Sequence, residues 1–163
     1  MRPMNKSSRH SKITGDFGEH LTLYLLSKFG FECARVDHTG IDIIARNLDT
    51  AEVMGITVKA RSRNLGRETT SLRIAADHFE KVTKACSAFN CVPYFSIVID
   101  RGDLTSVYLL PETALIELYP NAKRGLNWGM SDNHISRYRK HARLTILEFE
   151  SKITQRWSKE MPL

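Results

Sequence analysis

Residues 40–60 read GIDIIARNLDTAEVMGITVKA and give the clearest indication of the fold. Two runs rich in β-branched residues, 41–46 and 53–60, flank a turn-like segment at 47–50. Short runs of this kind, separated by turn residues, are typical of β-strands. The stretch therefore predicts two neighbouring strands joined by a short turn.

Further helices and strands are predicted on both sides of this pair. An apolar stripe at helical spacing, with Leu21, Leu25 and Phe29, predicts a first helix over residues 15–29, and a strand is expected over 31–36. After a polar loop at 61–71, a second stripe predicts a helix over 74–89. We then expect strands over 93–100 and 104–110, a short helix over 111–118 and a last helix over about 147–157. This order predicts an α/β fold with a mixed central sheet flanked by helices.

Length and composition indicate one globular domain. The chain has 163 residues, of which 42% are hydrophobic and 26% are charged, as is ordinary for a domain of this size. We expect a flexible basic N-terminal arm at residues 1–12 and a single domain at 13–163, with its core at 14–110 and a C-terminal extension at 111–163. No apolar run approaches the roughly 20 residues of a membrane span. No membrane partner is therefore expected.

The charge and the cysteines indicate the class of partner and the compartment. A net charge of +6 favours a polyanion, with nucleic acid before a membrane surface, although a solvated basic surface would give the same count. Cys33, Cys86 and Cys91 form neither a CxxC motif nor an even set, and no secretory signal precedes them. These features indicate a reducing, cytoplasmic compartment.

Four positions carry residues that could act on a phosphodiester. Glu19 falls midway along the first expected helix, Asp42 begins a strand, and Thr57 and Lys59 lie two apart on the next strand, so that they project from one face. Asp42 can reach the same patch if the two strands pair. Plainer readings remain: Asp42 could cap a turn, Glu19 could lie on a solvated helix face, and Thr57 could be a neutral strand residue. Lys59 favours a nearby carboxylate, because an unpaired lysine on an apolar strand is costly to bury.

In order and spacing, these residues resemble the PD-(D/E)xK nuclease superfamily, which includes restriction endonucleases and Holliday-junction resolvases. The motifs that carry the resemblance lie within residues 14–110 and are Gly15-x-x-Gly18-Glu19, Gly40-Ile41-Asp42 and Ile56-Thr57-Val58-Lys59. The resemblance implies a restriction-endonuclease-like core in the order α-β-β-β-α-β. It also implies an endonuclease that hydrolyses phosphodiester bonds in DNA with Mg²⁺ or Mn²⁺.

The resemblance assigns roles to three of the four residues. Asp42 matches the first acid, a metal ligand, and Glu19 matches the helical acid of the resolvase-like branches, a second ligand. Lys59 matches the lysine that positions the attacking water or balances charge on the phosphate. Thr57 stands where the superfamily has its second acid.

The threonine is a departure with a physical consequence. Mg²⁺ prefers carboxylate and water oxygens, so a neutral hydroxyl at Thr57 should weaken metal binding. A later helical acid replaces the second acid in some members of the superfamily, and Glu80 or Asp77 could do so here. Two functions therefore stay open: a metal-dependent nuclease, and a catalytically inactive nuclease-fold domain that binds nucleic acid or a partner protein.

Two basic sets could contact DNA, the expected nucleic acid. The first follows the third strand, is expected near the mouth of the site, and could equally be a solvated loop: Arg61, Arg63, Arg67 and Arg73. The second could flank a groove or form the polar face of a helix: Arg137, Arg139, Lys140, His141 and Arg143. Trp128 and Tyr138 lie near the second set and could stack on bases. The late region 119–163 could also form a homodimer.

Overall fold

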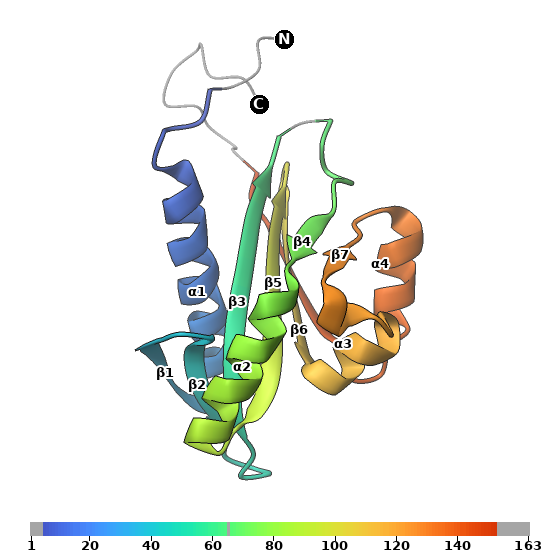
Figure 1. Ribbon diagram of the computed structural model, residues 1–163. Helices are drawn as coiled ribbons and strands as arrows, with labels where there is room; N and C mark the ends of the chain where they lie inside the picture. The colour runs from blue at the N-terminus through green and yellow to red at the C-terminus, as the bar shows by residue number, and fades with distance from the viewer. Residues whose placement is uncertain (1–4, 65, 153–163) are drawn as a thin grey trace.

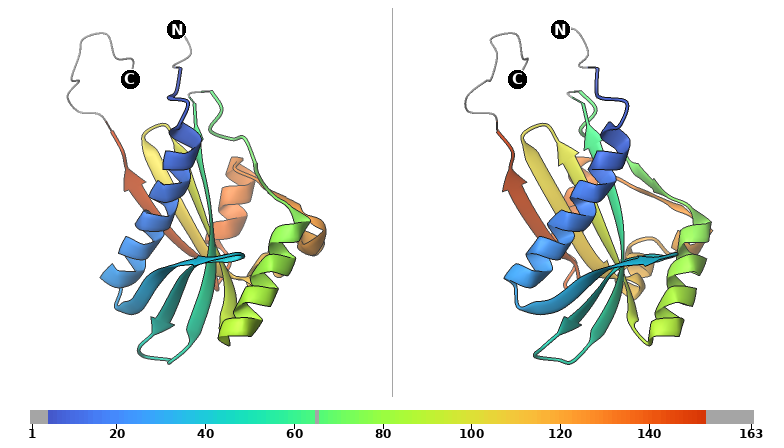
Figure 2. Two further views of the ribbon diagram at one scale, coloured as in Figure 1. Left: turned by 60° about the vertical axis from the view of Figure 1, so that its left-hand side comes forward. Right: turned by 90° about the vertical axis from the view of Figure 1, so that its left-hand side faces the viewer.

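A computed structural model describes residues 5–64 and 66–152 of the chain. A central sheet carries α1 on one face and α2 on the other (Figure 1, Figure 2). The elements are, in chain order, α1 (His10–Lys28), β1 (Phe31–His38), β2 (Ile41–Asn47), β3 (Val53–Arg63), β4 (Leu72–Ile74), α2 (Ala76–Phe89), β5 (Val92–Arg101), β6 (Leu104–Pro111), α3 (Glu112–Leu118), the 3₁₀ turn η1 (Ala122–Arg124), β7 (Leu126–Trp128), α4 (Asp132–Arg139) and β8 (Thr145–Glu150). None of the helices in this part of the chain is both long enough and apolar enough to cross a membrane.

The main sheet is mixed, with strand order β1-β2-β3-β5-β6-β8. Its neighbours pair antiparallel except for β3 and β5, which are parallel. Parallel neighbours need a long crossover, and α2 provides it. The expected α/β fold and the order α-β-β-β-α-β are confirmed. The short strand β4 enters between β3 and α2 and pairs with β7 in a separate two-stranded sheet.

Close packing of α1 on β3 depends on a glycine. A Cβ added at Gly18 would meet the side chains of Ala60, Val58 and Val98, so only glycine lets the helix approach this closely. Residues of one parity along a strand share a face. The even-numbered residues of this part of β3 therefore face α1, and the odd-numbered ones face α2.

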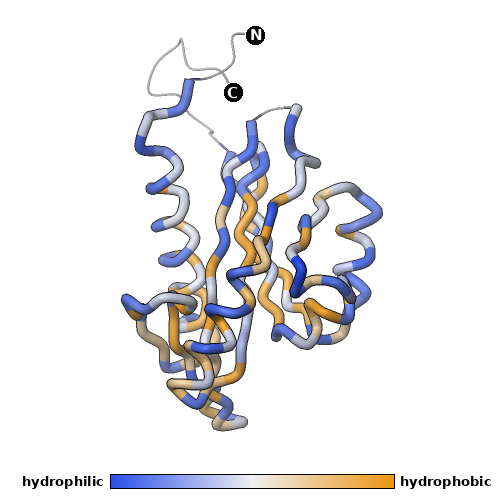
Figure 3. Tube along the Cα trace, in the orientation of Figure 1, coloured by the Kyte–Doolittle hydropathy of each residue, from blue (hydrophilic) through white to orange (hydrophobic). Residues whose placement is uncertain are grey.

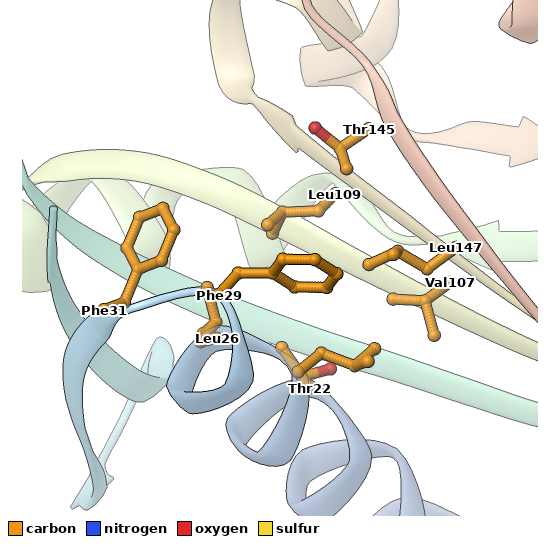
Figure 4. A pocket seen from close by; sticks show the side chains of 9 residues that line it. Thr22, Leu26, Phe29, Phe31, Val107, Leu109, Thr145 and Leu147 are labelled. Carbon is orange, nitrogen blue, oxygen red and sulfur yellow. The ribbon is translucent and has the colours of Figure 1, made fainter.

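Apolar side chains fill the centre of the molecule. Figure 3 shows hydrophobic residues along the middle of the strands and hydrophilic ones towards the upper end of β3. The larger buried cluster lies on the α2 side and includes Phe79, Phe95 and Trp128. On the α1 side, an apolar cavity of about 220 Å³ opens between α1, β6 and β8 (Figure 4), and its lining includes Leu26 and Leu147.

Several expected boundaries differ from the structure. Strand β3 continues to Arg63, into the expected polar loop 61–71, and Ile74 belongs to strand β4 and not to the helix expected over 74–89. Helix α1 begins at His10, so residues 10–12 of the expected flexible arm are helical, because no Pro or Gly interrupts residues 10–14. The helix expected over about 147–157 is wrong for its first residues, which belong to strand β8, and the residues after 152 lie outside the described part. Leu147 and Phe149 alternate with Glu148 and Glu150, which suits a strand on the free edge of β6.

Candidate functional site

Asp42 lies where β2 and β3 separate. The backbone ladder between the two strands ends at the pair Ile43–Ile56. Beyond it, the Asp42 carboxylate accepts a hydrogen bond from the backbone N–H of Val58 at 2.6 Å and a longer one from the Thr57 hydroxyl at 3.4 Å. A buried N–H needs an acceptor, and here a side chain supplies it in place of a strand. The Asp42 carboxylate therefore stabilises the backbone of β3 at the point where β2 and β3 diverge.

Thr57 and Lys59 project to the α2 side of β3. Two residues before Thr57, a Cβ added at Gly55 would meet the sulfur of Cys86 on α2. Alternation along the strand therefore directs Thr57 and Lys59 to the same side. Thr57 is 3% exposed, whereas Lys59 is half-buried. The two residues thus share a face, as their spacing predicts.

Lys59 lies among charges from three elements. Burial lowers its pKa, as do the nearby Arg61 and Lys81, while the carboxylates of Asp42 on β2 and Asp77 on α2 raise it. Burial is the largest of these effects, so the protein alone stabilises the ammonium less well than water does. The tertiary structure nevertheless brings Asp42, Lys59 and Asp77 together from separate elements.

The first turns of α2 form the other wall of this site. Asp77 and Lys81 form an ion pair at 2.6 Å across one helical turn. Burial lowers the pKa of His78, and the charges of Lys59 and Lys81 lower it further. Gly40, at φ 108°, brings the β1–β2 turn against the Lys81 backbone, where a Cβ would collide with the carbonyl. The turn that carries Asp42 is thus packed directly on the helix that carries Asp77.

Two other predicted acids lie elsewhere. Glu19 on α1 pairs with Arg35 on β1 at 2.5 Å, and Glu80 is exposed on α2. Neither acid is among the charges that shift the pKa of Lys59, whereas Asp77 is. Of the two replacement acids considered, Asp77 is therefore the one whose charge acts on Lys59.

The carboxylates as arranged do not fit Mg²⁺ or Mn²⁺. Such ions need several oxygen ligands converging on one point. Within residues 5–64 and 66–152, no three His, Cys, Asp or Glu side chains are grouped so that they could hold a metal ion. Asp42 binds the β3 backbone, Asp77 pairs with Lys81, and Glu19 pairs with Arg35. The neutral hydroxyl of Thr57 does not supply the missing carboxylate ligand.

Cations gather where β3 extends past α2, at the top of Figure 1. We call Lys6, Arg61, Arg63 and Arg101 the basic end of β3. Lys6 donates to the Ser62 carbonyl at 3.1 Å and to its hydroxyl at 3.0 Å. Arg61 and Arg63 each donate to a backbone carbonyl, at 2.9 and 2.6 Å. Arg63 also lies directly opposite Arg101 of β5 in the parallel ladder.

Carboxylates do not neutralise the basic end of β3. None of the ion pairs among the described residues includes any of its four members. Asp100, which precedes Arg101 on β5, accepts a hydrogen bond from the Ser62 hydroxyl at 2.9 Å. Burial lowers the pKa of Arg63, and repulsion from Arg61 lowers it further. The basic end therefore has an excess of positive charge.

The other predicted arginines of the first set lie further along the chain. Arg67 and Arg73 are both exposed. Arg73 is on β4, with its guanidinium beside Gly125. Both are candidates for phosphate contact. They are further from Lys59 along the chain than Arg61 and Arg63 are.

The second basic set surrounds two aromatic residues that are not available to stack on bases. Trp128 and Tyr138 are fully buried and stack on each other, with ring centroids 4.0 Å apart. The prediction that they stack on bases is therefore wrong, because the rings form part of the core under α4. The basic side chains around them pair largely with Glu117 and Glu148. Two glutamates thus partly offset the charge of this solvated set, in which Arg137 lies over the Tyr119 ring and Lys140 is exposed.

Sequence reasoning missed three residues near these two regions. Lys81 lies four residues after Asp77, a spacing that places opposite charges side by side on a helix, so the pattern could have indicated it. His78 directly follows Asp77, and a single histidine beside an acid does not by itself indicate a site. Lys6 contacts Ser62 across 56 residues of sequence, and no local pattern indicates such a contact.

Comparison with known proteins adds a partial structural similarity. No family model and no curated protein matches this chain. Among solved structures, the chain is similar to Hjc of Archaeoglobus fulgidus, a Holliday junction resolvase from an archaeal hyperthermophile. The similarity has 25% sequence identity, covers 61% of this chain and 74% of that one, and has a TM-score of 0.47. Since the two superpose only in part, the fold described above rests on the strand order and connectivity of this chain.

Proposed function

We propose that this domain binds nucleic acid, with DNA as the expected partner, through the basic end of β3 and the adjoining Lys59 site. The observation that supports the proposal is the excess of positive charge at Lys6, Arg61, Arg63 and Arg101, which form no ion pairs among the described residues. Backbone phosphates are the natural complement of such a cluster. The net charge of +6 on the chain adds long-range attraction.

Lys59 is the inner contact of this surface. Burial lowers its pKa, and a phosphate placed beside it would raise that pKa again by stabilising the charged form. Asp42 positions the strand that carries Lys59 through its hydrogen bond to Val58. In this proposal Asp42 is a positioning residue, and the arginines beyond Lys59 make the outer phosphate contacts.

A metal-dependent endonuclease acting on DNA is the second candidate. One observation favours it: Asp42, Lys59 and Asp77 come together from β2, β3 and α2, in the chain order of the PD-(D/E)xK superfamily. Binding of Mg²⁺ or Mn²⁺ would require Asp77 to leave its ion pair with Lys81. The binding proposal requires no such rearrangement, so we place it first.

One panel of substrates separates the two candidates. Duplex, single-stranded and junction DNA, and RNA, are incubated with the full chain in Mg²⁺, in Mn²⁺ or in chelator, and each sample is assayed for both retention and cleavage. We expect binding that weakens with salt, persists in chelator and leaves the substrate intact. Cleavage that chelator abolishes, and that Lys59→Ala and Asp42→Ala also remove, would decide for the nuclease.

The missing acid gives a graded test of the site. Thr57→Glu adds a carboxylate beside Asp42, and Thr57→Gln adds similar bulk without the charge. If the site lacks only this ligand, Thr57→Glu will bind Mn²⁺ in calorimetry and Thr57→Gln will not. If folded Thr57→Glu binds no Mn²⁺, the patch is not a metal site, and the second candidate fails.

A further inference from the structure

Two cysteine thiols meet above one glycine of β3. A Cβ added at Gly55 would lie 2.5 Å from the sulfur of Cys86 and 2.6 Å from that of Cys91. Two atoms this near to one point are at most about 5 Å apart. The Cys86 thiol also donates to the Gly55 carbonyl at 3.6 Å. The absence of a side chain at Gly55 is what lets both sulfurs occupy this space.

The backbone at the end of α2 brings the two cysteines together. Asn90 adopts the left-handed conformation, with φ 50° and ψ 49°. The N–H of Cys91 donates to the carbonyl of Cys86 at 2.9 Å, and the N–H of Asn90 donates to that of Ser87 at 3.4 Å. This pair of bonds is the Schellman motif, in which the residues at the two cysteine positions commonly touch through their side chains. The helix cap therefore places the two thiols close to each other.

The cysteine pair is separate from the candidate nucleic-acid site. Cys86 lies nine residues along α2 from Asp77, or about 14 Å at the rise of an α-helix. The third cysteine, Cys33, is on β1, where its thiol donates to the Leu23 carbonyl at 3.7 Å. Oxidation at the pair can thus be followed without disturbing Lys59, and Cys33 provides an internal control.

We propose that Cys86 and Cys91 form an oxidation site, which closes to an intrachain disulfide in the presence of a low-molecular-weight disulfide such as oxidised glutathione. Cys91 is half-buried whereas Cys86 is buried, so the Cys91 thiolate attacks first. A mixed disulfide forms, and one glutathione thiolate leaves and takes up a proton. The Cys86 thiolate then attacks the sulfur of Cys91 and displaces the second glutathione. Two protein thiols are oxidised and one small disulfide is reduced to two thiols.

The order of attack agrees with the chemistry of the buried thiol. Burial raises the pKa of Cys86 to about 12, and the neighbouring Cys91 thiol contributes to the rise. The thiolate is the nucleophile in exchange, so Cys86 is a poor first attacker but is well placed to resolve a mixed disulfide beside it. We therefore expect closure to be slow near neutral pH and to become faster as the pH rises.

Peptide mapping tests the proposal directly. The folded full chain is incubated with glutathione buffers of increasing oxidising strength, quenched in acid, alkylated and digested with trypsin. Cleavage after Lys84 and Arg101 releases both cysteines in one peptide, residues 85–101, whereas Cys33 falls in another. We expect the first peptide to lose two hydrogens and to escape alkylation, while Cys33 remains alkylated. Cys33→Ala should behave like the parent, and Cys91→Ala should leave Cys86 reduced.

Thermal unfolding then shows whether the disulfide belongs to the native cap. A disulfide compatible with the folded geometry should raise the midpoint by about 2–6 °C over the reduced chain, and Cys91→Ala should show no such shift. Two results would overturn the proposal: a stable glutathione adduct on Cys91 with Cys86 still alkylated, or a disulfide that lowers the midpoint. Either would mean that the two sulfurs do not close within the native fold.

Discussion

The two halves of β3 share one ladder with β5 but have opposite environments. The ladder to β5 is unbroken from Met54–Val92 to Arg63–Arg101. Residues 54–57 are buried between the helices, whereas residues 59–63 include the half-buried Lys59 and Arg63 and the exposed Arg61. Figure 1 shows this second half rising beyond α2. Hydrogen bonding thus maintains the strand along its whole length, while the helices decide which half forms core and which half can bind a ligand.

The largest loss of stability should come from a substitution in the buried half of β3. Ile56 is 0% exposed, so Ile56→Ala removes apolar contacts and leaves a cavity, at a cost of about 3–4 kcal/mol in the free energy of unfolding. Urea denaturation measures this loss. Ile13→Ala is the control, because Ile13 is 52% exposed and its truncation should cost less than about 1 kcal/mol. A small loss for Ile56→Ala would contradict the division of β3 into a core half and a binding half.

A smaller loss should follow from filling the space beside the cysteines. Gly55→Ala places a methyl group against the sulfurs of Cys86 and Cys91, and overpacking of this kind costs about 1–3 kcal/mol. Gly15→Ala is the matched control: Gly15 is within α1 and its Cβ would meet nothing within 4 Å. That control should stabilise the chain by about 0.5–1 kcal/mol. Equal effects of the two changes in urea denaturation would mean that the sulfurs do not constrain Gly55.

A substitution in the exposed half of β3 should weaken DNA binding and leave the free energy of unfolding nearly unchanged. Arg61→Ala removes one phosphate contact, so the slope of log affinity against log salt should fall by about 1, while the free energy of unfolding changes by about 0.5 kcal/mol or less. Fluorescence anisotropy with labelled DNA at several salt concentrations measures the slope. Lys28→Ala, at the other end of α1, should leave the slope unchanged. If both variants lose affinity equally, the basic end is not the binding surface.

The smallest effect concerns the pH dependence of stability beside Lys59. Burial and the charge of Lys59 lower the pKa of His78 from 6.5. As the pH falls below 6.5, the unfolded chain takes up this proton before the folded chain does, so the free energy of unfolding decreases until the folded-state pKa is passed. Above pH 6.5 the histidine is neutral in both states and has no such effect. His78→Gln should flatten this acid limb in denaturation curves between about pH 5 and about pH 8, and an unchanged limb would exclude His78 as its source.

Much of the fold could be predicted from local patterns. The apolar stripes indicated α1 and α2, and the β-branched runs indicated β2 and β3, because each pattern reflects the period of its own element. The same-face relation of Thr57 and Lys59 also followed from strand geometry alone. Strand β8 was missed because a short segment with alternating glutamates does not distinguish a strand from a helix. Pairing with the free edge of β6 makes this segment a strand.

The candidate site was predicted less completely than the fold. Asp42 and Lys59 do come together, but the sequence motif also implied a ligand role for Glu19, which pairs with Arg35. Asp77 became the better acid only when α2 packed against the β1–β2 turn at Gly40. The expected homodimer stays a prediction, which gel filtration of the full chain can test.

Residue identity and spacing within single elements were enough to predict the helix and strands from α1 to β3, the positive charge and the lack of an acid at Thr57. Which charges remain without a partner depends on how the elements pack in three dimensions. Glu19 and Asp77 have ion-pair partners, whereas the cations at the basic end of β3 have none among the described residues. The physical reason is that the strength of an electrostatic interaction depends on distance and burial. Both are set by packing between elements that are far apart in the chain.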